Sequence, residues 1–480
     1  MSSLVPLPAH VRTADGSLPL DGLSVVAGPS EEEQRLAAVA RHLLGLGAPA
    51  GDRPALVLAL DDAAGPGGAA SPERYSLEVS GAGAALTAPT TEGLFRGIAT
   101  LAQLSTVDGE GRAVLPAVVV KDAPRYPWRG LSLDVARHFF EPDVVERVID
   151  VMARYKLSVL HLHLTDDQGW RLELPSRRLL TEISGKGEIG DGVGGFYTMD
   201  EFRRLQEYAA ARYVQVVPEF DMPGHTNAAT HAYGELVPGG QPTDRFGGEE
   251  VGFSKLSFDL PETEPFLRDV FGDIAAATLG EYVHIGGDEV FTLGVEEYSR
   301  FVLLAHDVVT AAGKKVVGWQ EIAEVELPAD TVVQYWETRK DTAPLRRAVA
   351  GGAKILLSPA DRVYLDMKYD ADDARGQDWG ASMPPIELRD AYDWEPDAAV
   401  EGVDPDAVVG VEAAIWSERI PDEHTLFMRL LPRLAAVAEV AWTPVDARSW
   451  EGFAARVARE STGWRDRGLT FHESPGVDWA

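Results

Sequence analysis

Residues 281–290 read EYVHIGGDEV, a short apolar run that ends on two glycines and two adjacent carboxylates. Tyr282, Val283 and Ile285 suit a buried strand, whereas Asp288 and Glu289 do not suit a protein core. Gly and Asp are common in turns, so a solvated turn is the simplest interpretation of the motif alone. The alternative is a functional site at the end of a strand, and the rest of the chain decides between the two.

The same order of apolar strand, loop and helix recurs from about residue 125 to the C-terminus. Eight strands that alternate with helices over about 350 residues predict a (β/α)8 TIM barrel. The expected strands are 129–135, 157–164, 214–220, 282–287, 314–319, 331–336, 353–358 and 408–416. Helices with apolar residues three and four apart are expected at 143–156, 200–213, 264–279, 295–313 and 426–442.

A doubly wound open sheet would give a similar alternation of strands and helices. Such sheets usually carry a phosphate-binding glycine turn, and neither GxGxxG nor GxxxxGK[ST] is present. The chain before residue 124 mixes short apolar strands with amphipathic helices at 31–47 and 91–105, which predicts a small α+β domain. The segment KDAPRYPWRG (121–130), with two prolines, is a plausible boundary. We therefore expect an α/β protein with an α+β domain over 1–123 and the barrel over 124–480.

Composition excludes several classes of function for this 480-residue chain. The formal net charge of −32 argues against partners such as nucleic acid or anionic membranes. There is no cysteine, which excludes disulfides, thiolate catalysis and cysteine-ligated metal. The first 17 residues show no basic segment followed by an apolar run, and no apolar stretch approaches the roughly 20 residues that span a bilayer. These features predict a cytoplasmic protein of unknown oligomeric state.

Acids and tryptophans gather at the ends of the expected strands, where a barrel of this kind builds its functional site. Aromatic rings stack on the apolar faces of sugars, while carboxylates and arginine bind hydroxyl groups. Paired carboxylates are the usual equipment of glycoside hydrolysis. The residues concerned include Asp134, Arg137, Asp166, Asp167, Glu219, Asp221, Asp288, Glu289, Trp319, Glu321, Trp336, Glu337, Asp366, Trp416 and Glu418. Their convergence favours a catalytic interpretation of Asp288 and Glu289 over a solvated turn.

His161 and His163 lie two residues apart near Asp166, a spacing that a metal site can use. Histidines that point into a barrel are more often hydrogen-bonded core residues, and we expect neither a metal nor a cofactor. A serine hydrolase is also disfavoured, because the chain has no GxSxG elbow.

Six segments of the chain resemble signature sequences of family 20 glycoside hydrolases, in particular the bacterial β-N-acetylhexosaminidases. They are WRGLSLDVARHFF (128–140), HLHLTDDQGWRLEL (161–174), VVPEFDMPGHTNAA (216–229), HIGGDE (284–289), SPADRVYLDMKY (358–369) and GVEAAIWSE (410–418). The resemblance spans the barrel, and the smaller domain resembles the α+β domain that usually precedes it in the family. It implies an exo-acting, retaining enzyme of carbohydrate metabolism that acts on N-acetylhexosamine-terminated oligosaccharides, such as chitin fragments, or on glycoconjugates.

The resemblance also implies substrate-assisted catalysis, in which the 2-acetamido carbonyl attacks the anomeric carbon and forms an oxazolinium intermediate. Glu289 matches the general acid/base, Asp288 the residue that orients the acetamide, and Tyr364 the hydroxyl that bonds the acetamide oxygen. Trp379 matches a residue beside the leaving group. The aromatic box around the acetamido methyl group is matched by Trp319, Trp336 and Trp416.

Other matching residues grip the terminal sugar. Arg137 and Glu418 match a pair that binds its outer hydroxyls, and Asp366 matches a further hydroxyl ligand. Asp166 and His225 match a pair that tunes the proton of the acid/base. Closure of the pocket by these residues implies exo-cleavage of terminal N-acetylglucosamine, with N-acetylgalactosamine as a possible second substrate.

Two alternatives stay open at this point. A lacto-N-biosidase-like enzyme would have a wider pocket for a disaccharide, which the presence of Arg137 and Glu418 disfavours. A catalytically silent glycan-binding protein would have lost Asp288, Glu289 or Tyr364, and all three are present. The chain departs from the family at Leu162, where tryptophan is frequent. It also departs in the segments VFTLGVEEY (290–298) and SGKGEIGDGVGGFY (184–197), which puts the preference for the leaving group in doubt.

Overall fold

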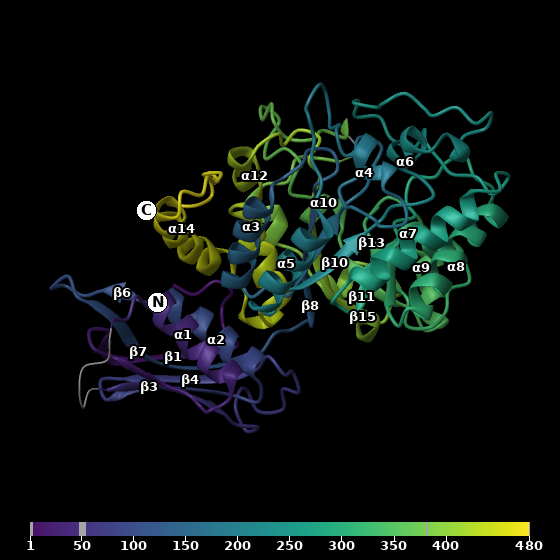
Figure 1. Cartoon of the computed structure of the whole chain (residues 1–480). Helices are drawn as coiled ribbons and strands as arrows, with labels where there is room; N and C mark the ends of the chain where they lie inside the picture. The colour runs from purple at the N-terminus through teal and green to yellow at the C-terminus, as the bar shows by residue number, and fades with distance from the viewer. Residues whose placement is uncertain (1–2, 48–53, 381–382, 480) are drawn as a thin grey trace.

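The computed structural model describes residues 3–47, 54–380 and 383–479, so the outermost residues of the two expected domains lie outside it. An N-terminal sheet with two helices packs beneath a closed barrel whose helices surround it (Figure 1). The sheet ends at Asp122 and the first barrel strand begins at Trp128. The connection therefore runs through the proline-containing segment 121–130.

The barrel is built from eight parallel strands in the closed order β10-β11-β12-β13-β14-β15-β8-β9. Their bounds are β8 (Trp128–Asp134), β9 (Val159–His163), β10 (Gln215–Glu219), β11 (Tyr282–His284), β12 (Lys315–Trp319), β13 (Val332–Tyr335), β14 (Lys354–Leu357) and β15 (Val408–Ile415). Each lies within or overlaps one of the expected strands, and the barrel prediction is confirmed. Apart from the ends of five of them, their residues are buried, as strands covered by helices on every side must be.

The barrel helices follow the expected positions with one correction. Residues 426–442 do not form one helix, because α12 (Glu423–Leu430) ends before Pro432 and α13 (Arg433–Trp442) begins after it. A proline disfavours helical backbone at the preceding residue, and Leu431 is extended, with ψ at 133°. The longer helices are α3 (Pro142–Arg154), α5 (Met199–Ala210), α7 (Thr263–Ala277), α8 (Val295–Ala311), α9 (Ala343–Ala350) and α14 (Trp450–Asp466). Shorter ones are α4 (Leu179–Ser184), α6 (Asn227–Ala232), α10 (Ala360–Val363) and α11 (Leu388–Tyr392).

The N-terminal domain is a mixed sheet in the order β1-β7-β4-β5-β3-β2, with β6 paired to β7. Its strands are β1 (His10–Pro19), β2 (Ser24–Val26), β3 (Ala55–Leu60), β4 (Tyr75–Ser80), β5 (Gly83–Ala88), β6 (Thr106–Val107) and β7 (Ala113–Asp122), and its helices are α1 (Glu31–Leu43) and α2 (Thr91–Leu104). The sequence pattern misses β1 because this edge strand is largely exposed and carries polar residues on both faces. None of the helices in the described residues has the length and apolar character needed to cross a membrane.

Buried ion pairs join the two domains. Glu73 of the N-terminal domain binds Arg129 of β8, with Oε1 3.0 Å from Nη1, and Arg96 of α2, with Oε2 2.8 Å from Nε. Both arginines are fully buried. A second pair joins Lys156 to Asp122 at 3.0 Å, and Asp122 also accepts a hydrogen bond from the indole of Trp442. Separation of the two domains would leave these buried charges without their partners, which is costly. The ion pairs therefore fix the orientation of the barrel on the sheet.

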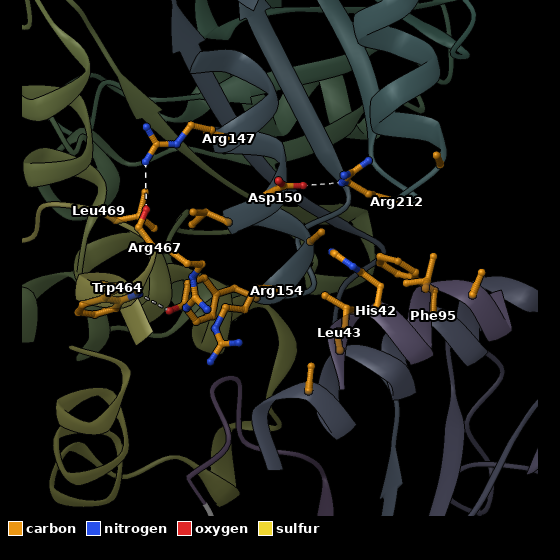
Figure 2. Close-up of a pocket in the computed structure, with 18 of the residues that line it drawn as sticks. His42, Leu43, Phe95, Arg147, Asp150, Arg154, Arg212, Trp464, Arg467 and Leu469 are labelled. Atoms are coloured by element: carbon orange, nitrogen blue, oxygen red, sulfur yellow. Dashed lines mark hydrogen bonds and ion pairs between the residues drawn. The ribbon is translucent and has the colours of Figure 1, made fainter. Parts of the chain in front are cut away.

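A cavity of about 780 Å³ lies beside these pairs, between α1 and α2 on one side and α3 and α14 on the other. Figure 2 shows Phe95 and Leu43 on the side of the N-terminal domain and Arg467 and Trp464 on the side of the C-terminal helix. It contains no pair of neighbouring carboxylates, and it lies away from the carboxyl ends of the barrel strands. The larger of the two main cavities is therefore a space between domains and not the candidate site.

The substitution Glu73→Ala tests the domain junction. It leaves Arg96 and Arg129 buried without the carboxylate that they share, and we expect the free energy of unfolding to fall by about 3–5 kcal/mol. Urea denaturation measures the loss. The control is Glu110→Ala, which removes a surface ion pair with Arg112 and should change the stability by less than about 1 kcal/mol. Equal small effects of both substitutions would contradict this account of the junction.

Candidate active site

A tight turn after β11 carries the two adjacent carboxylates. Gly286 and Gly287 have φ angles of +70° and +106°, and Glu289 itself has a φ of +51°. A Cβ atom on Gly286 would lie 1.9 Å from Oδ1 of Asp221, so only glycine fits there. Because the backbone turns instead of continuing as a strand, Asp288 and Glu289 both reach the same cavity.

This cavity, of about 310 Å³, opens at the carboxyl ends of the barrel strands. That volume is at the lower end of the range of ~300–1,000 Å³ for ligand pockets. Its lining includes eleven of the twelve residues that the family resemblance assigns to the site. They are Arg137, Asp166, His225, Asp288, Glu289, Trp336, Tyr364, Asp366, Trp379, Trp416 and Glu418.

Trp319 is the one of these twelve residues that does not line the cavity. Its side chain is 1% exposed, its ring centre lies 5.7 Å from that of Trp416, and its indole donates a hydrogen bond to Glu219. It therefore supports the wall from behind Trp416, and its expected contact with the ligand stays a prediction.

Asp288 shares a buried environment with Asp221, which follows β10. Their carboxyl groups have oxygens within 4.8 Å of each other, and Asp221 accepts a hydrogen bond of 2.9 Å from the backbone N–H of Gly287. Burial raises the pKa of Asp221 to about 7, and burial together with the Asp221 carboxylate raises the pKa of Asp288 well above its usual range. Burial and the like charge of its neighbour both favour a protonated carboxyl group in this pair.

A chain of ionic contacts leads from the cavity floor to Glu289. Arg137 lies 2.8 Å from Asp166, whose other oxygen is 3.2 Å from Nδ1 of His225. Nε2 of His225 is 3.5 Å from Glu289 and 3.8 Å from Asp288. Burial alone would lower the pKa of His225, but the carboxylates of Asp166 and Asp221 raise it well above its usual range. A charged imidazole therefore faces the candidate acid/base.

Four aromatic rings form one wall. The rings of Trp336 and Tyr364 are nearly parallel, with their centres 6.3 Å apart. Trp379 meets Tyr364 edge-on, with 5.5 Å between the ring centres. Trp416 lies 6.0 Å from Tyr364 and beneath the guanidinium of Arg137, which is 5.1 Å from its ring centre. An apolar wall beside polar groups is the arrangement that binds the two faces and the hydroxyl edge of a sugar.

Several buried polar atoms of the cavity have no hydrogen-bond partner within the described part of the chain. Burial raises the pKa of Asp366 to about 7 and also raises that of Glu418. Buried polar groups are normally paired, so these atoms are suited to bind a polyhydroxylated ligand. They include Nε of Arg137, Oδ2 of Asp221, Nε2 of His225, Oδ1 of Asp288, Oδ2 of Asp366 and Oε2 of Glu418.

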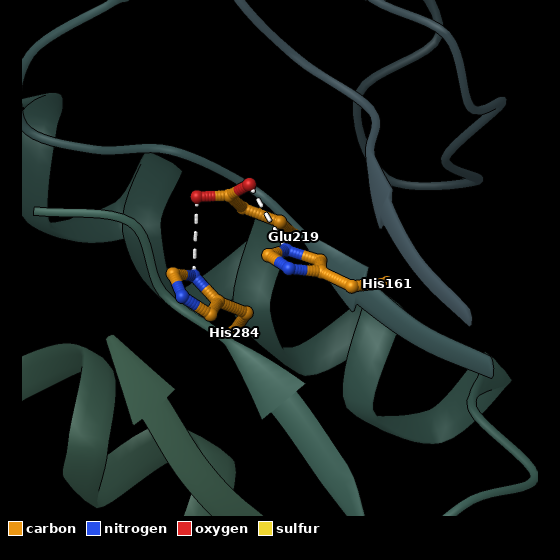
Figure 3. A group of neighbouring side chains, drawn as sticks. All are labelled: His161, Glu219 and His284. Carbon is orange, nitrogen blue, oxygen red and sulfur yellow. Dashed lines mark ion pairs between the residues drawn. The ribbon is translucent and has the colours of Figure 1, made fainter. Parts of the chain in front are cut away.

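Beneath the cavity, His161, Glu219 and His284 are close enough to share a cation (Figure 3). The hydrogen bonds already present account for most of their polar atoms. Nδ1 of His284 accepts the backbone N–H of Gly286, and Glu219 pairs with His163 and Trp319 as well. The neighbouring carboxylates more than offset burial and raise the pKa of His161 to about 9 and that of His163 to about 10. These charged histidines neutralise Glu219, so the donor set fits an ionic core better than a metal site.

Sequence reasoning left several cavity residues out of the site. Asp221 stood out only as an acid at a strand end, and its contact with Gly286 appears only in three dimensions. Five others come from loops without a regular pattern, namely Glu249, Val251, Gln377, Asp378 and Arg419. No periodicity marks such positions, and only the closing of the barrel brings them to the cavity.

Comparison with known proteins agrees with this geometry. The catalytic domain of glycosyl hydrolase family 20 matches residues 126–300 and 294–445, and domain 2 of the same family matches residues 1–123. A β-N-acetylhexosaminidase of Cellulomonas fimi is 54% identical over 85% of this chain and 82% of its own length.

Solved structures are similar over the whole chain. The family 20 β-N-acetylhexosaminidase of Streptomyces coelicolor superposes with a TM-score of 0.94 at 37% identity, covering 100% of this chain and 99% of that one. A variant Streptomyces plicatus β-hexosaminidase in complex with its product GlcNAc gives a TM-score of 0.93 at 37% identity, with 100% and 98% of the two chains covered. The chain therefore belongs to glycoside hydrolase family 20.

Proposed function

We propose that this protein is an exo-acting, retaining β-N-acetylhexosaminidase that releases one terminal N-acetylhexosamine in each cleavage. The observation that carries the proposal is the meeting of Asp288, Glu289 and Tyr364 in one small cavity with an aromatic wall. Membership of family 20 and the named activity of the Cellulomonas fimi relative support it.

The substrate's own acetamide supplies the nucleophile. Its carbonyl oxygen attacks the anomeric carbon while the glycosidic C–O bond breaks, and Glu289 gives its proton to the departing oxygen. The resulting oxazolinium ion is then opened by water, which returns a proton to Glu289 and regenerates the acetamide. Asp288 binds the acetamide N–H and stabilises the positive charge that develops there, while Tyr364 bonds the acetamide oxygen.

The closed floor of the cavity accounts for exo-cleavage. Arg137, Asp366 and Glu418 present charged and unpaired polar atoms to the hydroxyl groups of the terminal sugar. A continuing chain beyond that sugar would meet these residues. A volume of about 310 Å³ supports release of a monosaccharide over release of a disaccharide. The substrates are N-acetylhexosamine-terminated oligosaccharides or glycoconjugates, with N-acetylglucosamine first and N-acetylgalactosamine second. The cytoplasmic location stays a prediction that cell fractionation tests.

Hydrolysis of matched aryl glycosides tests the need for the acetamide. We expect the aryl β-N-acetylglucosaminide to be cleaved at least about 10³-fold faster than the aryl β-glucoside, because only the former carries an internal nucleophile. The comparison of kcat/KM for the two substrates measures this. Similar values would point to a nucleophile from the protein and contradict the proposal.

The substitution Glu289→Gln tests the assignment of the acid/base. A poor leaving group needs a proton more than a good one does. For the bond-breaking step we therefore expect kcat to fall about 10²–10⁴-fold on a disaccharide. The fall on a 2,4-dinitrophenyl glycoside, which has a good leaving group, should be much smaller. Single-turnover kinetics separate this step from hydrolysis of the intermediate.

Two matched variants make the comparison specific. Asp288→Asn should slow bond breaking on both substrates alike, because it acts on the nucleophile. Glu296→Gln, at an exposed acid in α8, should leave both rates unchanged. An equal loss on the two substrates in Glu289→Gln would exclude its role as the acid.

A further inference from the structure

The glycine pair after β11 needs contacts from other elements to keep its shape. Glycine is the least restricted residue of the backbone, so two in a row make a soft turn. The first peptide of the turn, between Gly286 and Gly287, is held on both sides. The carbonyl of Gly286 accepts the backbone N–H of Trp319 at 2.9 Å. The N–H of Gly287 donates to Asp221 at 2.9 Å. The next peptide, between Gly287 and Asp288, sets where the Asp288 side chain begins.

Tyr298 of α8 holds this second peptide. Its hydroxyl donates a hydrogen bond of 2.6 Å to the carbonyl oxygen of Gly287. Within the described ranges of the chain, no other group hydrogen-bonds to the C=O of Gly287 or to the N–H of Asp288. A Cβ atom on Gly287 would lie 3.1 Å from the same hydroxyl, so the tip of the ring closes against the turn. The peptide from which Asp288 extends is therefore supported by Tyr298.

The side chain of Tyr298 starts from a fixed base. It lies in the first turn of α8, where its backbone N–H donates to the carbonyl of Gly294 at 2.9 Å. The preceding residue, Glu297, accepts hydrogen bonds of 2.8 Å from the hydroxyl of Ser257 and from the backbone N–H of Phe258. The ring of Tyr298 packs against the hydrophobic core of the barrel. The hydroxyl therefore reaches Gly287 from a helix that is itself tied down.

Tyr298 is suited to hold the turn and not to contact the sugar. Burial and the nearby carboxylates of Glu321 and Asp288 raise its pKa well above its usual range, so the phenol keeps the proton that it donates. It is not among the described residues that line the cavity. It also lies outside the six segments that carry the resemblance to the family, in the departing stretch 290–298. Any effect on the reaction must therefore pass through the turn.

We propose that Tyr298 is a positioning residue, which holds the Gly287–Asp288 peptide so that Asp288 meets the N–H of the substrate's acetamide. The inference rests on the proposed function, because it concerns the group that orients the nucleophile. Attack on the anomeric carbon depends steeply on the placement of the reacting atoms. Without the hydroxyl the peptide can rotate, and fewer bound substrates have the acetamide aligned. Binding should suffer little, because Arg137 and Glu418 lie outside this turn.

The substitution Tyr298→Phe removes the hydroxyl and keeps the ring. In single-turnover kinetics we expect bond breaking to slow about tenfold, as the loss of one hydrogen bond allows, while the Kd of the substrate changes less than about twofold. The slowing should be equal on a disaccharide and on a 2,4-dinitrophenyl glycoside, because Tyr298 acts on the nucleophile. A loss confined to the disaccharide would place the effect on Glu289 and overturn the inference.

A double-mutant cycle with Asp288→Asn shows whether Tyr298 acts through Asp288. In the Asp288→Asn background, Tyr298→Phe should slow bond breaking less than about twofold, because the carboxylate that it positions is already absent. A further tenfold loss in the double variant would show that the two residues act independently and would overturn the inference.

Tyr155→Phe is the matched control for the loss of a buried tyrosine hydroxyl. That hydroxyl donates to Glu460 at 2.9 Å, beside the cavity between the domains and away from the candidate site. We expect both variants to unfold at a lower urea concentration than the wild type, but only Tyr298→Phe to slow bond breaking. Equal slowing in both would mean that stability and not the position of the turn sets the rate.

The outcomes separate this inference from the proposed function. Similar cleavage of the aryl β-N-acetylglucosaminide and the aryl β-glucoside by the wild type would contradict the proposed function itself. Cleavage of the acetamido substrate alone, at the same rate in the wild type and in Tyr298→Phe, would overturn the inference and leave the proposed function intact.

Discussion

Close contact between the turn after β11 and Asp221 sets the arrangement of the whole site. The backbone at Gly286 approaches the carboxyl group of Asp221 so closely that no larger residue fits, and Gly287 donates its N–H to the same group. This contact fixes the turn against the end of β10. Neighbouring residues of a strand would point to opposite faces. Here the left-handed backbone at Gly286, Gly287 and Glu289 directs two consecutive acids into one cavity. A residue such as Glu289 in this conformation costs on the order of 1–3 kcal/mol, which the surrounding barrel must offset.

An ionic core lies under the site. Glu219, which has no solvent exposure, is surrounded by His161, His163 and the indole of Trp319. His163 continues this network to Asp166, and Asp166 continues it to Arg137 and His225. Every one of these groups is buried, so removal of a single member would leave a charge without its partner. These contacts therefore hold the proposed catalytic groups in place before substrate arrives, which is the arrangement that electrostatic catalysis requires.

Much of this architecture is predictable from the sequence because barrel strands are short, apolar and regularly spaced. The acids at their ends are visible for the same reason, but the expected strand 282–287 was too long, because Gly286 and Gly287 form a turn after β11. Three features escape the pattern. The exposed edge strand β1 lacks an apolar face, the division between α12 and α13 depends on Pro432, and the cavity residues Glu249 and Asp378 lie in loops. Periodicity reports burial along one element, whereas this part of the cavity is made by loops that only the closed barrel brings together.

The central claim is that the acetamide of the substrate, and not a group of the protein, attacks the anomeric carbon. The most direct measurement is kcat/KM for a series of aryl β-glucosaminides whose N-acyl group carries zero, one, two or three fluorine atoms. Fluorine withdraws electrons from the carbonyl and weakens it as a nucleophile, with a small change in size. The account predicts a steep, continuous fall in kcat/KM across the series, by more than about 10²-fold from acetyl to trifluoroacetyl. A flat dependence would contradict it, because the acyl group would then take no part in bond breaking.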